Sequence, residues 1–176
     1  MRYFVLHQDK RIAYMPHPKD FHQKIDMRNV NAHRAGLVPF RTTIMLRPNK
    51  QTVFPDVINR PTLLVTRDVR DIIRKYDEHV AYRQIAYLDS ENEKTQLYFM
   101  PMLESIDCLS EASEYENEYN ASFSKVAIKK EAVRDKSLFL IKTEVQRVVI
   151  IRLDLAESLL VRKYKGFSLT EAIIET

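Results

Sequence analysis

The chain has 176 residues, of which 45% are hydrophobic and 30% are charged, a balance typical of a globular protein. The formal net charge of +4 is weak evidence for a polyanionic partner. The only two glycines, Gly36 and Gly166, are too few for a dinucleotide fingerprint, a P-loop or a nucleophile elbow. The single cysteine, Cys108, excludes an internal disulfide and every multi-cysteine metal site.

The apolar runs of the chain are short. The first one, Tyr3 to Leu6, has four residues, whereas a signal-peptide core needs about seven and a membrane helix about 20. A lone cysteine also fits a reducing compartment. We therefore expect a cytoplasmic protein with no membrane association.

The first segment, residues 1–52, is basic and poorly periodic. Ten basic residues against three acidic ones give it a net charge of +7, and four of the five histidines lie in it. Tyr3 to Leu6 predicts a strand, and the four prolines between Pro16 and Pro48 predict irregular structure with a short helix near Phe21 to Val30. We expect this segment to pack on an α+β core formed by residues 53–176, within a single domain.

Residues 61–103 have a clearer pattern. Thr62 to Val65 predicts a strand, with Thr66 as the N-cap of a helix whose apolar side chains recur at helical spacing: Val69, Ile72, Ile73 and Tyr76. The opposite face of this helix carries Arg67, Arg70, Arg74 and Lys75, and we expect it to be solvated. Residues 80–88 and 95–103 predict two strands of a hairpin, joined by the polar turn 90–94.

The last third predicts further strands and one more helix. Strands are expected at residues 124–128, 137–142, 148–151 and 167–169. A helix is expected to start at Asp154 as its cap, to place Leu155, Ala156, Leu159 and Leu160 on one face, and to end at Gly166 as its C-terminal cap. The chain thus contains two strand–helix–strand passages. The expected class is α+β, with a mixed or largely antiparallel sheet and two main helices.

No catalytic, cofactor or metal site is predicted. His17 and His22 lie five residues apart, but a metal site needs three or four converging ligands, so we interpret them as solvated loop residues. Cys108 follows Asp107, and negative charge raises the pKa of a thiol, so we interpret it as a buried apolar residue rather than a nucleophile.

Two segments are candidates for recognising a partner. Aromatic residues lie among the basic residues of segment 1–52, which would suit phosphate contact and base stacking in a nucleic acid. Residues 104–124 contain six acidic residues and no lysine or arginine, and predict an exposed loop or a short frayed helix. Tyrosines among charges are typical of protein-binding contacts. The candidate partner-binding residues are therefore Glu111, Glu114, Tyr115, Glu116, Glu118 and Tyr119.

The order of several short motifs resembles a bacterial immunity-protein family of polymorphic toxin systems, named after a myxobacterial protein. The matching pieces are Asp56-Val57-Ile58, Pro61-Thr62-Leu63-Leu64-Val65-Thr66, Tyr98-Phe99-Met100-Pro101, Ile106-Asp107-Cys108-Leu109, Ser113-Glu114-Tyr115, Leu138-Phe139-Leu140-Ile141, Val149-Ile150-Ile151 and Gly166-Phe167-Ser168-Leu169. Each piece is weakly specific alone, and their order and spacing carry the resemblance. The N-terminal third matches only loosely.

The resemblance implies a non-enzymatic protein that binds and neutralises a cognate toxin in the cytosol of the producing cell. It implies no catalytic residues and supplies no binding residues, so the acidic segment is chosen on charge complementarity with a basic toxin cleft. The alternative hypothesis is a nucleic-acid-associated module that uses the basic first segment. An enzyme without a familiar motif is a third option, and the oligomeric state stays open.

Overall fold

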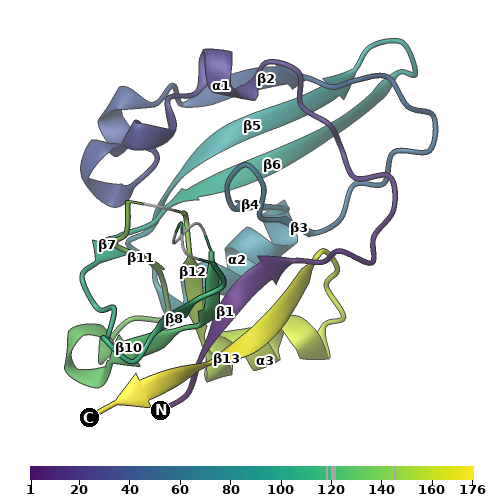
Figure 1. Ribbon diagram of the computed structural model, residues 1–176. Helices are drawn as coiled ribbons and strands as arrows, with labels where there is room; N and C mark the ends of the chain where they lie inside the picture. The colour runs from purple at the N-terminus through teal and green to yellow at the C-terminus, as the bar shows by residue number, and fades with distance from the viewer. Residues whose placement is uncertain (118, 120–121, 145) are drawn as a thin grey trace.

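The computed structural model describes residues 1–117, 119, 122–144 and 146–176. Its two larger sheets are mixed, which confirms the expected α+β class but distributes the strands over two sheets (Figure 1). The six-stranded sheet has the order β10 (Ala127–Lys129), β13 (Phe167–Glu175), β1 (Tyr3–Gln8), β12 (Val149–Arg152), β11 (Leu138–Ile141) and β7 (Ser105–Ile106). The five-stranded sheet has the order β2 (Arg41–Met45), β5 (Ala81–Asp89), β6 (Lys94–Met102), β4 (Leu64–Val65) and β3 (Val57–Ile58).

Both expected strand–helix–strand passages are present. Helix α2 (Arg67–Tyr76) connects β4 to β5, and both strands pair antiparallel with β6, which lies between them. Helix α3 (Leu153–Val161) connects β12 to β13, and both strands pair antiparallel with β1. Each helix therefore links two parallel strands that flank a third, so the two passages share one architecture.

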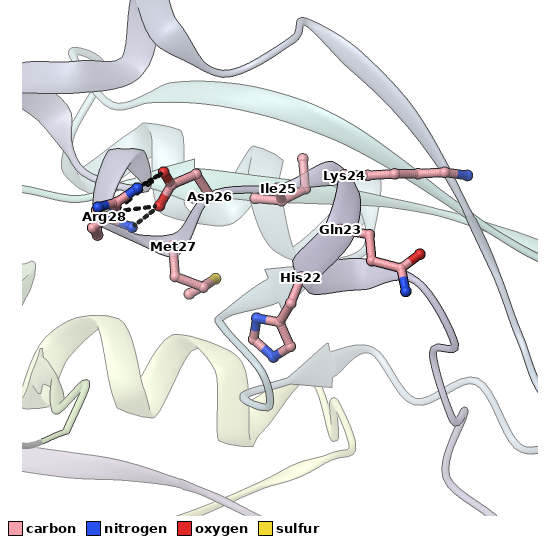
Figure 2. A pocket seen from close by; sticks show the side chains of 7 residues that line it. All are labelled: His22, Gln23, Lys24, Ile25, Asp26, Met27 and Arg28. Carbon is pink, nitrogen blue, oxygen red and sulfur yellow. Dashed lines mark hydrogen bonds and ion pairs between the residues drawn. The ribbon is translucent and has the colours of Figure 1, made fainter.

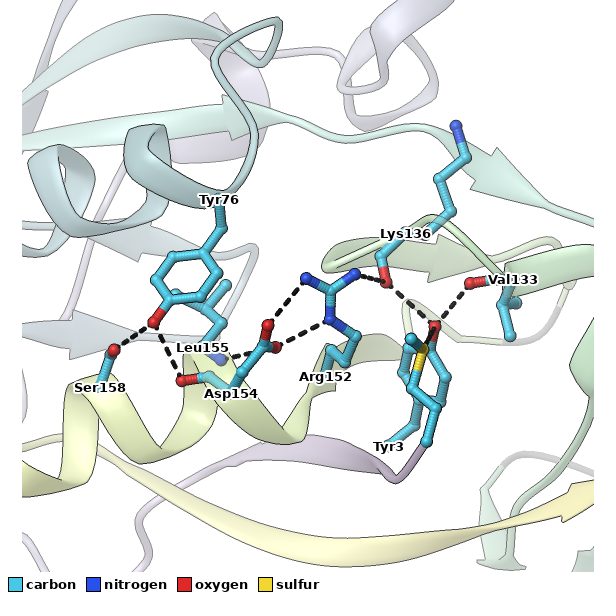
Figure 3. Close-up of polar contacts among 9 residues, drawn as sticks. Tyr3, Tyr76, Val133, Lys136, Arg152, Asp154, Leu155 and Ser158 are labelled. Carbon is cyan, nitrogen blue, oxygen red and sulfur yellow. Dashed lines mark hydrogen bonds and ion pairs between the residues drawn. The ribbon is translucent and has the colours of Figure 1, made fainter.

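The two helices pack against each other and against both sheets. One core cluster contains Val69 and Ile73 of α2, Leu155 of α3, Phe99 of β6 and Leu6 of β1, together with other side chains of both sheets. Figure 3 shows that the Tyr76 hydroxyl of α2 contacts the Ser158 hydroxyl and the carbonyl of Asp154 in α3. The shared apolar core and these hydrogen bonds fix the two helices relative to each other.

The other face of each sheet is covered by irregular chain. Short helix α1 (Phe21–Lys24), the 3-10 turns η1 (Met27–Asn29) and η2 (Ala32–Leu37), and the segments beside them place Phe21, Ile25, Val30 and Val38 on the five-stranded sheet. On the six-stranded sheet, Cys108, Val126 and Ile128 form a third cluster with Phe139 and other strand residues. The turn η3 (Lys130–Val133) adds Val133 to this third cluster.

The helix ends differ from the sequence predictions. Thr66 occupies the N-cap position of α2, but its side chain makes no capping hydrogen bond. Helix α3 begins at Leu153, so Asp154 lies in its first turn rather than at its cap. In this position the Asp154 carboxylate pairs with Arg152, whose Nε lies 2.8 Å from Asp154 Oδ1 (Figure 3). The helix ends at Val161, and Lys163 rather than Gly166 adopts the left-handed backbone that follows it, with a φ of 60°. The prediction of Gly166 as the C-cap is therefore wrong.

Gly166 instead begins the turn into β13 and has a φ of +114°. A Cβ at this position would lie 1.9 Å from the carbonyl oxygen of Val57. The Gly166 carbonyl accepts hydrogen bonds from the Asp9 amide at 3.0 Å and from Gln8 Nε2 at 2.8 Å. Glycine is required here because the backbone of residue 166 approaches β3 without room for a side chain.

Candidate functional site

The acidic segment contains a short two-stranded ribbon. Strand β8 (Glu114–Tyr115) pairs antiparallel with β9 (Phe123–Lys125), so extended structure replaces the expected loop or frayed helix at residues 114–115 and 123–124, as it does in β7 at residues 105–106. The Tyr115 and Phe123 rings are stacked, with centroids 4.5 Å apart and an interplanar angle of 27°. Phe123 also packs against the third core cluster. The aromatic pair therefore fixes the ribbon to the six-stranded sheet.

The structure brings together only part of the predicted binding set. Glu114, Tyr115 and Glu116 are consecutive and exposed on the ribbon. Tyr119 is 89% exposed in the segment between the two strands, and Glu111 is exposed in a turn ahead of β8. Glu118 lies outside the described residues.

Some of the negative charge is compensated within the chain. Lys125 Nζ lies 2.9 Å from Glu114 Oε1, and Lys136 pairs with Glu104. The Glu116 carboxylate accepts a hydrogen bond from the Ser122 hydroxyl. In the parts of the segment that the structure describes, Asp107, Glu111 and Glu116 have no cation within ion-pair distance. The ribbon is therefore acidic and aromatic, but less strongly charged than its composition indicates.

A groove with a volume of about 680 Å³ lies beside this ribbon. Four separate stretches of chain form it: the second half of β1 with Lys10, the residues 59–61, the ribbon, and the residues 146–148. Its polar and charged lining residues are His7, Gln8, Lys10, Asn59, Arg60, Glu116, Ser122, Gln146 and Arg147. Asn59 is held against β1 by two hydrogen bonds. Its backbone amide donates to Gln8 Oε1 and its side chain donates to the carbonyl of Leu6, each at 2.8 Å.

Sequence reasoning did not find this groove. Its cations come from positions as far apart as Lys10, Arg60 and Arg147, and no local pattern connects them. They meet because β1 lies next to β12, so that the residues preceding β12 reach the end of β1. The groove can therefore be recognised only once the pairing of strands that are distant in the sequence is known.

A second hollow, around residues 22–28, contains no converging groups. Figure 2 shows that Asp26 forms an ion pair with Arg28 and that His22 points away from this pair. The Arg28 amino nitrogen lies 2.7 Å from the Asp26 carboxylate. The Arg28 side chain and backbone hold the pKa of Asp26 at about 2. His17 and His22 are both exposed, as expected for solvated residues. Within the described ranges, no group of three or more His, Cys, Asp or Glu side chains is arranged to hold a metal ion.

The basic charges are also spread and partly paired. In segment 1–52, Arg2 pairs with Glu171, and Arg11, Lys24 and Arg28 pair with acidic residues close to them in sequence. On α2, Arg70 does not belong to a solvated face: its guanidinium carbon lies 4.1 Å from the centroid of the Phe99 ring. Part of the arginine-rich face is thus packed on the sheet.

Cys108 is fully buried, as the sequence predicted. Burial, reinforced by Asp107, raises the pKa of its thiol to about 11. At pH 8 only about one thiol in a thousand is then ionised, against about a quarter for an ordinary cysteine. We expect a water-soluble disulfide reagent to label Cys108 at least about a hundredfold more slowly in the native protein than in denaturant.

The labelling reaction can be followed by absorbance, with the denatured protein as its control. Labelling of the native protein at the rate of a free thiol would contradict this burial of Cys108.

The chemically distinctive surface of the described residues is an acidic aromatic ribbon beside a groove lined by basic side chains. Comparison with known families agrees with the resemblance noted from the sequence: residues 3–173 match the immunity protein family (Imm11). The match covers nearly the whole chain, the N-terminal third included, and the protein therefore belongs to this family. No curated protein matches the chain significantly.

No helix in the described part of the chain is both long and apolar enough to cross a bilayer.

Proposed function

We propose that this protein binds a cognate bacterial toxin and neutralises it in the cytosol of the producing cell, by surface complementarity and without chemistry of its own. The match of residues 3–173 to an immunity protein family is the observation that carries the proposal. An inhibitor of this kind must compete with the toxin's target, so it needs a sizeable interface with a few well-placed anchors.

The ribbon supplies anchors of the required chemistry. Tyr115 and Tyr119 offer large side chains, of which the first is held rigidly against Phe123 and the second is exposed. The carboxylates of Glu111 and Glu116 are available to a basic surface. Glu114 pairs with Lys125 in the free protein and can pair with a cation of the partner instead. A toxin that acts on nucleic acid has a basic cleft, and opposite charge accelerates its capture.

The test first asks whether a large secreted toxin is encoded directly upstream of this chain's gene. It then uses that upstream product, made as an inactive variant, as the binding partner. Wild-type protein is expected to co-purify with it and to protect cells that express the active toxin. The combined substitutions Glu114→Lys, Glu116→Lys and Glu118→Lys are expected to weaken toxin binding at least about tenfold, because they place cations against a basic surface. Isothermal titration calorimetry measures the affinity.

The matched control reverses three exposed carboxylates away from the ribbon, Glu78→Lys, Glu91→Lys and Glu157→Lys, and is expected to bind as the wild type does. Thermal unfolding verifies that both variants fold. Unchanged affinity in the ribbon variant removes the ribbon from the interface, and a wild-type protein that neither binds nor protects overturns the proposed function.

The nucleic-acid alternative is separated by a salt titration against generic DNA and RNA. Micromolar affinity with a steep salt dependence would favour it. The pairing of Arg2, Arg11, Lys24 and Arg28 with carboxylates reduces the charge that segment 1–52 can offer to phosphates. We therefore expect no such binding.

A further inference from the structure

The groove beside the ribbon concentrates positive charge. His7 and Lys10 lie at the end of β1 and just beyond it, Arg60 follows β3, and Arg147 precedes β12. Glu116 is the only acidic residue among the lining residues that the structure describes. The groove also has apolar walls, to which Val5, Pro61 and Phe123 contribute. A ligand here would meet cations on an amphipathic surface.

Arg147 is the most buried of these cations. One of its amino nitrogens donates to the carbonyl of Val30 at 2.7 Å, which anchors the guanidinium in a half-buried position. Across the described ranges, no carboxylate lies within ion-pair distance of it. Burial lowers the pKa of Arg147, as expected for a cation that has lost water without gaining an anion. A guanidinium has five donors, so most of its hydrogen-bonding capacity is left for a ligand.

Lys10 and Arg60 carry the remaining positive charge of the groove, and His7 lines the same groove as an imidazole that is uncharged at neutral pH. Burial lowers the pKa of the His7 imidazole, Lys10 and Arg60 lower it further, and Glu116 opposes them. Lys10, Arg60 and Glu116 therefore each lie within electrostatic range of His7. Lys10 and Arg60 are exposed, and no carboxylate of the described residues lies within ion-pair distance of either, so an incoming anion would not have to displace an internal partner.

The arrangement of charge favours an acidic side chain of a protein over the phosphates of a nucleic acid. A nucleic acid would present a continuous row of phosphates, and phosphates that leave the groove over the ribbon would meet Glu114 and Glu116. A protein surface can instead place one carboxylate among the cations and a lysine or arginine against the ribbon. The pairing of cationic groove and acidic ribbon therefore fits a partner with the opposite arrangement, an acidic side chain next to basic ones.

We infer that the groove lined by His7, Lys10, Arg60 and Arg147 is a second contact of the toxin interface, and that it receives a carboxylate side chain of the toxin while the ribbon contacts neighbouring basic residues. This inference rests on the proposed function. It adds a cationic subsite to that function and specifies the toxin surface further. A basic toxin surface without a nearby acidic residue would contact the ribbon but not the groove.

The first experiment compares toxin binding of two double variants with the same change in charge. Lys10→Glu with Arg60→Glu reverses two exposed cations of the groove and is expected to weaken binding of the inactive upstream toxin at least about tenfold. Lys19→Glu with Arg47→Glu reverses two exposed cations outside the groove and is expected to leave affinity within about twofold of wild type. If wild-type protein binds the toxin and the two variants bind equally, the groove is not a contact.

The second experiment needs no toxin. Amide NMR of the wild-type protein is recorded during titration with a short blocked peptide that carries one aspartate between two lysines, with the asparagine version of the same peptide as control. Shifts confined to residues 7–10, 59–61 and 146–147, seen with aspartate and lost in the groove variant, support the inference. Equal shifts with both peptides, or none, contradict it.

A thymidine oligonucleotide and inorganic phosphate complete the titration. Stronger shifts of the groove amides with the oligonucleotide than with the aspartate peptide would assign the groove to phosphodiesters and overturn the inference. Since the peptide result stands whether or not the upstream toxin binds, failure of the groove and failure of the proposed function can be told apart.

Discussion

Replacement of Gly166 by alanine is expected to lower the free energy of unfolding by about 3 kcal/mol or more. The backbone of residue 166 has a φ of +114°, which a side chain makes unfavourable, and the new Cβ would collide with the Val57 carbonyl. The atom in the way is backbone, so it cannot swing aside. Chemical denaturation followed by circular dichroism measures the loss.

Gly36 provides the matched control, because nothing lies within 4 Å of a Cβ built there. Gly36→Ala should change the unfolding free energy by less than about 1 kcal/mol. Equal stability of the two variants would mean that β13 does not begin against β3 in solution. Since Gly166 also accepts a hydrogen bond from Gln8, which lines the groove, Gly166→Ala should weaken any ligand binding there as well.

Phe139→Ala is expected to have the second large effect, a loss of about 3–5 kcal/mol in the free energy of unfolding. Phe139 is completely buried in the cluster on the six-stranded sheet, and its ring meets Tyr3 edge-on with centroids 5.9 Å apart. Phe123 of the ribbon packs against the same cluster. The cavity should therefore speed amide hydrogen exchange in β8 and β9 more than in the β5–β6 hairpin.

The exposed Phe40 is the control for this substitution. Its side chain is 64% exposed, so Phe40→Ala should cost less than about 1 kcal/mol. If Phe139→Ala were equally mild, or if exchange rose uniformly over both sheets, the packing of the ribbon on this cluster would be wrong.

The sequence was sufficient where the pattern is local. Val69, Ile72 and Ile73 recur at helical spacing and are all buried in α2, and the polar residues after Asp89 form the turn of the β5–β6 hairpin. Strand β2 escaped detection because only Ile44 of its five residues is fully buried, so no clear alternation marks this edge strand. The strand predicted at residues 124–128 is divided between β9 and β10, and β8 was missed because its two residues are too few to show a period.

Caps and distant pairings were harder to predict. Glycine is the usual residue in left-handed backbone after a helix, yet Lys163 holds that conformation here, and Gly166 is needed for its close approach to Val57. Of the candidate site, the acidic and tyrosine side chains could be named from composition. The groove could not, because it exists only when β1 pairs with strands that follow it by more than 140 residues.

The central place of β1 has a consequence for how the protein becomes active. β1 leaves the ribosome well before β12 and β13, which enclose it in the sheet and follow it by more than 140 residues. Until residues 149–175 have been synthesised, the central strands of the six-stranded sheet cannot pair, and the apolar side chains of residues 3–6 stay exposed to solvent. Closure of loops this long also makes folding slow. A chain whose translation stops before β13 therefore cannot complete this sheet.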